Sequence, residues 1–271
     1  MGGGAGAGLI MASFVGALVG QTWLASACLG LALVGFGLTM VFFEIGRPWR
    51  SLNVFLHPQT SWMTREGVVA VPLFGSGAIA LAAGWLGWRE AAIAALALTS
   101  LLAVGFLYCQ ARILRAAKGI PTWRNPALTP YILITGLTEG TGLFAAFHPS
   151  AAAVVLALLI LRFIAWRRYR RALGQSGAPE ASLDVLDRLA RWLLIGGHAL
   201  PGLLLGAALL LPQWPALAVF GGLLAAFFGL YAKLVLITRA ARTQGFAIPR
   251  TPVRGRGSSR QAASRPGWAS R

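Results

Sequence analysis

Long apolar stretches recur along this chain of 271 residues, and they constrain its fold more than any other feature. The composition is 57% hydrophobic and only 11% charged. A run of about 20 apolar residues is long enough to cross the hydrocarbon core of a bilayer as a helix. Because lipid offers no partner to unpaired backbone groups, such runs fold as helices. The sequence therefore predicts an all-α, polytopic transmembrane helix bundle and argues against a soluble enzyme.

We interpret these stretches as about eight membrane spans. They cover residues 4–20, 22–44, 67–88, 91–112, 128–147, 150–168, 188–211 and 214–238. Residues 1–248 form the expected transmembrane domain, and residues 249–271 form a basic tail that we expect to be disordered. The first span is short and opens directly on glycine-rich apolar sequence, so we expect the natural chain to begin upstream.

The basic residues are sorted along the chain. Of the 24 Lys and Arg, all but Arg89 lie around the connections after the second, fourth and sixth spans, or in the last span and the tail. Eight spans place all of these regions on one face, which the positive-inside rule makes cytoplasmic. Both termini are then cytoplasmic as well. We interpret the net charge of +17 as a record of topology, with the lipid bilayer and not nucleic acid as the partner.

The histidines and cysteines argue against a haem or a metal centre. A b-type haem needs two axial ligands that face each other within the helices. His57 lies in a connection and His148 at the opposite membrane edge, which leaves His198 as the one intramembrane histidine. Cys28 and Cys109 are far apart in apolar runs and cannot supply a cluster. We expect neither haem nor metal in this chain.

One polar segment stands out between the second and third spans. It reads E-I-G-R-P-W-R-S-L-N-V-F-L-H-P-Q-T-S-W-M-T-R-E and holds two of the chain's seven acidic residues. A quinone headgroup needs a hydrogen-bond donor at each carbonyl, a group that exchanges protons, and an apolar slot open to lipid. The candidate quinone-binding residues in this segment are Glu44, Arg47, Asn53, His57, Trp62, Arg65 and Glu66.

Two interpretations of this segment remain open. In the simpler one, Glu44 and Glu66 are interfacial carboxylates that neutralise neighbouring arginines. In the other, they belong to a quinone pocket at the cytoplasmic membrane edge. Trp123, in I-P-T-W-R-N-P of the next cytoplasmic connection, would then wall the same site. Interfacial tryptophan is common in any membrane protein, so Trp123 alone does not decide between them.

Ionisable residues inside the membrane form a second candidate site. Glu139, in L-T-E-G-T-G-L, and His198, before Pro201, both fall near the middle of a span. Burial of such groups is costly, so they are functional candidates by default. The alternatives are a carboxyl that packs helices by bonding Thr or backbone, and a hydrogen-bonded core histidine. Lys233, near the cytoplasmic end of the last span, is expected to snorkel toward the surface.

The same motifs resemble a known family. E-I-G-R-P-W-R-S-L-N, followed by S-W-M-T-R-E and by G-I-P-T-W-R-N-P-A-L-T-P, is similar to the membrane anchor subunit of dimethyl sulfoxide reductase and its relatives. The similarity extends to the closing K-L-V-L-I-T-R-A-A-R-T-Q-G-F. The branch that it resembles most serves sulfite-oxidising and phenylacetyl-CoA-oxidising complexes. Some members have His where this chain has Glu44.

The resemblance implies an eight-helix, haem-free anchor in the bacterial inner membrane. Such an anchor binds menaquinone or ubiquinone and exchanges electrons with an iron–sulfur subunit, which serves a molybdopterin catalytic subunit. The functional residues carry over to Arg47, Arg65, Glu66 and the end of the second span. Because the motifs lie on the basic face, both partners are expected on the cytoplasmic side.

The sequence therefore predicts a quinone-reactive anchor subunit without an active site for the soluble substrate. We expect it to reduce quinone while the complex oxidises a small substrate such as sulfite. Two alternatives stand beside this prediction. One is a small proton-coupled secondary transporter that uses Glu139 and His198, and the other is a purely structural membrane anchor.

Overall fold

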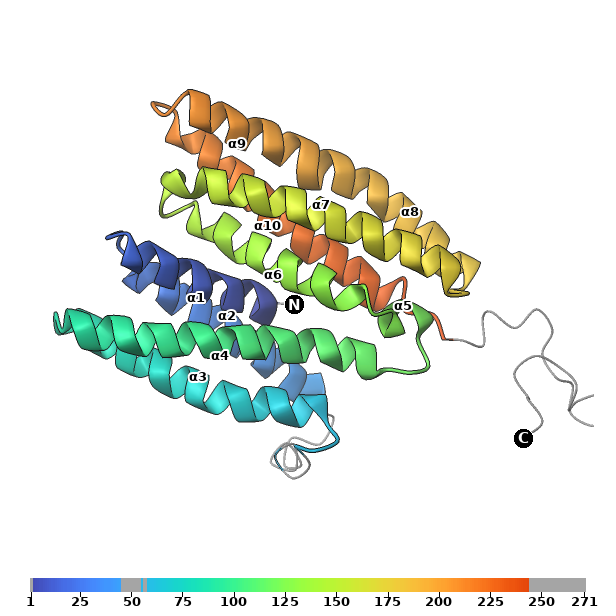
Figure 1. Ribbon diagram of the computed structural model, residues 1–271, viewed down its shortest axis with the longest axis horizontal. Coiled ribbons are helices and arrows are strands. Elements are labelled where there is room, and N and C mark those ends of the chain that lie inside the picture. Colours follow the sequence, from blue (N-terminus) through green and yellow to red (C-terminus); the bar gives the residue numbers. More distant parts are fainter. Residues whose placement is uncertain (1, 45–54, 56–57, 244–271) are drawn as a thin grey trace, which may run out of the picture.

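The computed structural model describes residues 2–44, 55 and 58–243, and every regular element in this part of the chain is a helix. In chain order the elements are α1 (Gly2–Leu18), α2 (Leu24–Glu44), α3 (Trp62–Trp85), α4 (Arg89–Ala116), α5 (Pro121–Arg124), α6 (Leu128–Phe144), η2 (Pro149–Ala151), α7 (Ala152–Gln175), α8 (Glu180–Leu194), η3 (Ile195–Ala199), α9 (Leu200–Leu210) and α10 (Pro215–Thr238). Figure 1 shows the long helices side by side, running back and forth along one direction. The prediction of an all-α bundle is confirmed for these residues.

Six helical stretches within the described residues are long and apolar enough to cross a membrane. They are Leu24–Phe43, Trp62–Trp85, Arg89–Ala116, Pro149–Gln175, Glu180–Leu210 and Pro215–Thr238. The apolar helix α1 has 17 residues, and α6 also has 17. The chain is a multi-pass membrane protein, whereas the number of eight spans and the cytoplasmic position of both termini stay predictions. The proposed tail, residues 249–271, lies outside the described residues.

Helix α3 begins earlier than hydropathy predicts. It starts at Trp62 and not at residue 67, because Ser61 caps it: the Ser61 hydroxyl accepts a hydrogen bond from the Thr64 amide at 3.2 Å. The polar end of the candidate segment is therefore helical. This places Arg65 and Glu66 on the same helix as Trp62.

The seventh predicted span is also longer than hydropathy indicates. It runs continuously from Glu180, not from residue 188, through the π-helical turn η3 to Leu210. Its first turns are amphipathic, with Leu186, Leu189 and Leu193 buried. A hydropathy window misses such turns because their exposed face is charged.

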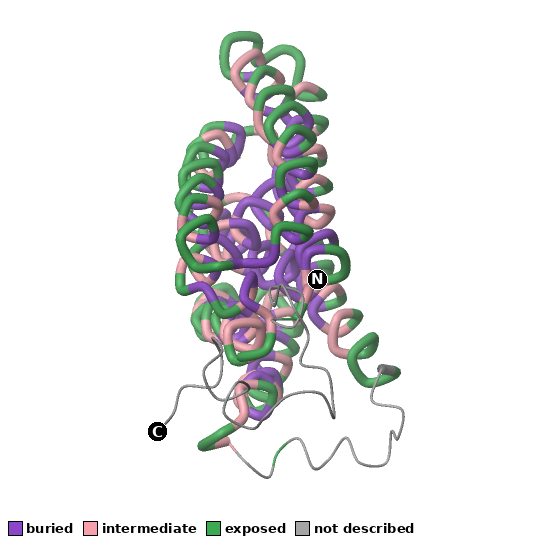
Figure 2. Tube along the Cα trace, turned by 90° about the vertical axis from the view of Figure 1, so that its right-hand side faces the viewer, coloured by how far each residue is buried: buried purple, intermediate pink, exposed green. Residues whose placement is uncertain are grey.

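Helix α6 lies at the centre of the bundle, between α1 and α10. Glycines allow this close approach. A Cβ atom on Gly8 of α1 would overlap the carbonyl of Gly136 on α6, and a Cβ on Gly142 of α6 would lie 2.5 Å from the carbonyl oxygen of Gly222 on α10. Small residues serve helix packing in membranes, where backbone contact replaces the hydrophobic effect as the driving force. Figure 2 shows the resulting buried interior and exposed outer surface.

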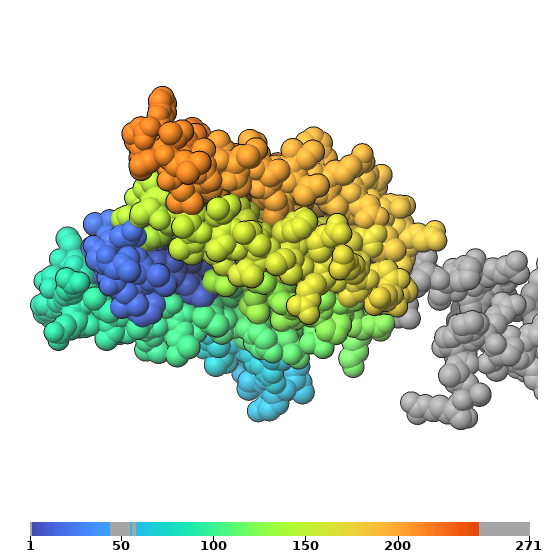
Figure 3. Space-filling view, turned by 45° about the horizontal axis from the view of Figure 1, so that its top comes forward, coloured from blue at the N-terminus to red at the C-terminus, as the bar shows by residue number. Residues whose placement is uncertain are grey.

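The two ends of the bundle differ in charge. The turns that join α1 to α2, α3 to α4, α6 to α7 and α9 to α10 lie at one end, and α5 and the α7–α8 connection lie at the other (Figure 1). Cations of residues 112–124, 167–171 and 188–191 gather toward this second end, which we call the basic end, whereas Arg89 begins α4 at the first. In Figure 3, α7 (yellow-green), α8 (gold) and α9 (orange) form a continuous packed face up to the basic end.

Candidate functional site

The structure describes part of the predicted quinone site. Glu44 ends α2, whereas Arg47, Asn53 and His57 lie outside the described residues. Trp62, Arg65 and Glu66 occupy the first two turns of α3, at the basic end of the bundle. Trp62 and Glu66 are four positions apart, so they lie on one helix face. Their role in binding quinone stays a prediction.

An aromatic ring and two guanidinium groups form the outer part of this site. The guanidinium carbon of Arg65 lies 4.2 Å from the Trp62 ring centroid, and that of Arg112 lies 4.5 Å from it. Arg112 also donates a hydrogen bond from Nη1 to the Tyr108 hydroxyl at 3.0 Å. Cation–π contacts of this kind attract the cation to the ring face. The cluster therefore holds two positive charges next to one aromatic ring at the basic end of the bundle.

Arg65 is tied to the chain that precedes α3. Its Nε donates to the Pro58 carbonyl at 2.7 Å, and its Nη2 donates to the Gln59 carbonyl at 2.8 Å. The end of the polar segment is thereby fastened over the first turn of α3. Arg65 thus orders the backbone as well as supplying charge.

The carboxyl of Glu66 forms the inner part of the site. Glu66 is buried, with 9% of its surface exposed, and lies next to the side chain of Gln110 on α4. The α4 residues Tyr108, Gln110 and Arg112 were missed from the sequence. The available signal was that polar side chains cluster near the end of the fourth apolar stretch, at the same membrane level as Glu66.

Trp123 makes its contacts elsewhere. Its indole N–H donates to the Leu236 carbonyl at 3.2 Å, and the neighbouring Thr122 hydroxyl donates to the Ala240 carbonyl at 3.2 Å. The ring packs against the buried cluster of α6, α7, α8 and α10. These contacts fasten α5 to the end of α10. A role for Trp123 in walling the quinone site stays a prediction.

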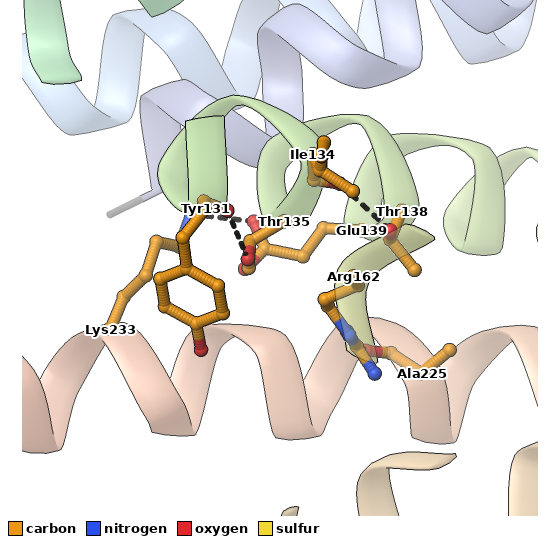
Figure 4. A network of polar contacts seen from close by, with 8 residues as sticks. All are labelled: Tyr131, Ile134, Thr135, Thr138, Glu139, Arg162, Ala225 and Lys233. Atoms are coloured by element: carbon orange, nitrogen blue, oxygen red, sulfur yellow. Dashed lines mark hydrogen bonds and ion pairs between the residues drawn. The ribbon is translucent and has the colours of Figure 1, made fainter. Parts of the chain in front are cut away.

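A buried ion pair lies deeper in the bundle. Lys233 Nζ on α10 lies 2.6 Å from Glu139 Oε2 on α6, and both residues are buried, at 4% and 0% exposure (Figure 4). The expectation that Lys233 snorkels to the surface is wrong, because its ammonium turns inward to a carboxylate that α6 presents. Glu139 therefore pairs with a cation, whereas the alternative expected from the sequence was a hydrogen bond to a Thr side chain or to the backbone.

Arg162 on α7 joins the same region. From the sequence we assigned it to the cytoplasmic connections, but it is completely buried. It donates hydrogen bonds to the Ala225 carbonyl at 2.7 Å and to the Gly197 carbonyl (Figure 4 shows the Ala225 side). A Cβ atom on Gly229 of α10 would lie 2.8 Å from Glu139 Oε1 and 3.0 Å from Arg162 Nη1, so a glycine lets these two groups approach.

His198 lies in the π-helical turn η3, next to Arg162. Its Nδ1 is 2.7 Å from the Leu193 carbonyl oxygen, and its Nε2 is 3.5 Å from Arg162 Nε. His198 is therefore hydrogen-bonded but only partly buried, and its role as a core histidine stays a prediction. A π-turn shifts the carbonyl pattern of a helix, and here Gly197 presents its carbonyl to Arg162.

Comparison with known proteins gives one informative similarity. The chain is 29% identical over 167 residues to a sulfite dehydrogenase subunit of Allochromatium vinosum, a match that covers 53% of this chain and 51% of that protein. The chain therefore spans about half the length of the curated relative that it matches. No family model matches the chain, and no solved structure matches it.

Proposed function

We propose that the chain is a membrane subunit of a sulfite-oxidising complex and passes electrons from a partner iron–sulfur subunit to a quinone. Its place would be the bacterial inner membrane, with a molybdopterin catalytic subunit beyond the iron–sulfur subunit. The observation that carries the proposal is the similarity to a sulfite dehydrogenase subunit over 167 residues. The multi-pass fold supports it, because such a subunit must hold a lipid-soluble electron acceptor in the bilayer.

The chemistry divides between the subunits. Oxidation of sulfite, with water as the source of the added oxygen atom, gives sulfate, two protons and two electrons. Quinone takes up two electrons and two protons to become quinol. The membrane subunit therefore has to bind the quinone headgroup and deliver protons to it, while the electrons arrive from the partner.

The side chains at the basic end of α3 and α4 fit this task. The guanidinium groups of Arg65 and Arg112 would donate hydrogen bonds to a quinone carbonyl oxygen and stabilise negative charge that develops there. Glu66, buried next to Gln110, would exchange the proton. Met63 and Tyr108, on the same turns of α3 and α4, are exposed at 42% and 38%, which supports access from the lipid side.

Exchange of Glu66 for Gln tests this function. In the complex assembled with its partner subunits, Glu66→Gln removes the proton-exchanging group but keeps a polar side chain of the same size next to Gln110. We expect sulfite-driven quinone reduction to fall on the order of 100-fold, as for loss of a positioned general acid. Sulfite oxidation with an artificial soluble acceptor should be unaffected.

The matched control is Glu90→Gln, because Glu90 is exposed in the first turn of α4 at the opposite end of the bundle. Full quinone turnover in Glu66→Gln would contradict the proposal and favour a purely structural anchor. A purified chain that transports a solute without partner subunits would instead favour the transporter alternative.

A further inference from the structure

A series of polar side chains leads from Glu66 into the centre of the bundle. Gln110 lies next to Glu66 and reaches the first turn of α1. A Cβ atom on Gly4 would lie 3.3 Å from Gln110 Oε1 and 3.1 Å from Lys233 Nζ. The amide and the ammonium therefore both lie beside Gly4, and the Lys233–Glu139 ion pair continues the series inward.

The charges of the inner cluster are unequal. Glu139 carries the one negative charge, and Lys233 and Arg162 carry two positive charges beside it. Arginine does not lose its proton in proteins, whereas lysine does. Release of one proton by Lys233 would leave Glu139 and Arg162 as a balanced pair. Glu139 Oε1 has no hydrogen-bond partner among the described residues, so the carboxylate has capacity for one.

Helix packing alone does not account for these charges. The bundle joins helices elsewhere with neutral pairs: Ser13 and Ser26 hydroxyls lie 2.7 Å apart, and Thr99 donates to Ser76 at 2.9 Å. Charged groups inside a membrane are costly and mark proton or ion pathways. Unlike the hydroxyl groups of these neutral pairs, the ammonium group of Lys233 can donate a proton to a base.

We propose that Lys233 is an internal proton donor, which supplies protons through Gln110 and Glu66 to a quinone bound at the basic end. This inference rests on the proposed quinone function. Reduction of quinone takes two electrons, which the partner subunit supplies, and two protons. Glu66 gives the first proton, the Lys233 ammonium then reprotonates the Glu66 carboxylate and becomes a neutral amine, and Glu66 gives this second proton to the quinone. Protons from the aqueous side restore both groups before the next turnover. Gln110 holds the two groups in line, and a water molecule carries the proton past the amide, which does not ionise.

Two substitutions of Lys233 separate proton transfer from structure. Lys233→Arg keeps the positive charge next to Glu139 but cannot release a proton, and Lys233→Met removes the charge and leaves Glu139 balanced by Arg162. In the full complex we expect both variants to lower the turnover number for quinone reduction on the order of 100-fold. The KM for quinone should not change, and the solvent deuterium isotope effect should rise.

A merely structural ion pair predicts a different result, in which Lys233→Arg retains turnover and the isotope effect of the unsubstituted complex. That result would overturn the proposal. A loss of turnover in Glu66→Gln together with full turnover in both Lys233 variants would reject the internal donor and leave the quinone function standing. Full turnover in all three variants would contradict the quinone function itself.

Gly4→Ala provides a test that leaves every charged residue in place. Its methyl group would enter the space between Gln110 Oε1 and Lys233 Nζ, whereas the control Gly2→Ala meets its nearest atom at 3.4 Å, an ordinary contact. We expect Gly4→Ala to slow quinone reduction with a raised isotope effect and Gly2→Ala to leave both unchanged. Equal turnover in the two alanine variants would overturn the proposal even if the Lys233 variants failed to assemble.

Discussion

At the scale of single residues, Trp62 organises the outer part of the proposed quinone site. Two guanidinium groups lie within 4.5 Å of its ring centroid. Trp62→Leu removes both cation–π contacts, each worth about 0.5–1 kcal/mol at exposed sites. We expect the KM for quinone to rise about fivefold, as for a loss of about 1 kcal/mol. The control is Trp88→Leu, since Trp88 is 64% exposed at the opposite end; equal KM values in the two variants would contradict the role of Trp62.

Some single residues could be placed from the sequence, and two buried cations could not. Glu139, His198 and Glu66 were identified because a polar residue is conspicuous in or beside an apolar run. Arg162 and Lys233 were misplaced because each lies toward the basic end of its run, where cations normally face the surface. The partners that turn them inward come from other helices, and Lys233 and Glu139 are 94 positions apart. One sequence holds no sign of such a pairing.

At the scale of helices, the packing of α1 against α6 depends on glycine. A Cβ atom on Gly140 would overlap the backbone of Gly8 and Leu9, where no side chain can rotate away. Gly140→Ala should therefore separate α1 from α6 and destabilise the bundle by about 1–3 kcal/mol or more, as overpacking does. Thermal unfolding in detergent measures this loss of stability as a lower unfolding temperature. Gly206→Ala, which meets nothing within 4 Å, should unfold at the original temperature, and equal melting of both variants would refute the close contact.

Helices themselves were largely predictable, and their ends were not. Apolar runs located the long helices because a membrane demands about 20 apolar residues in a row. The ends at Trp62 and Glu180 depend instead on a capping serine and on an amphipathic first turn. A hydropathy window averages over many residues and therefore detects neither feature. The π-turn η3 was not predicted either. Its effect is that the Gly197 carbonyl faces Arg162, and this contact is visible only in the three-dimensional structure.

At the scale of the whole molecule, the segregation of charge predicts orientation. The exposed cations gather at the basic end, so the positive-inside rule places that end in the cytoplasm. Single cysteines at two exposed turns test this in a Cys28→Ser background. Ser176, between α7 and α8, is at the basic end, and Gln213, between α9 and α10, is at the other.

A membrane-impermeant thiol reagent should label Gln213→Cys in intact cells and Ser176→Cys only after the cells are opened. The physical reason is that cations near the ends of spans resist transfer across the bilayer, so short basic connections stay inside. This orientation would also present the basic end, with Trp62 and Glu66, to electron-donating partners in the cytoplasm. Labelling of Ser176→Cys alone in intact cells would reverse the topology and move the proposed partners to the outer face. The native Cys109 is buried and should stay unlabelled in both preparations, which provides the internal control.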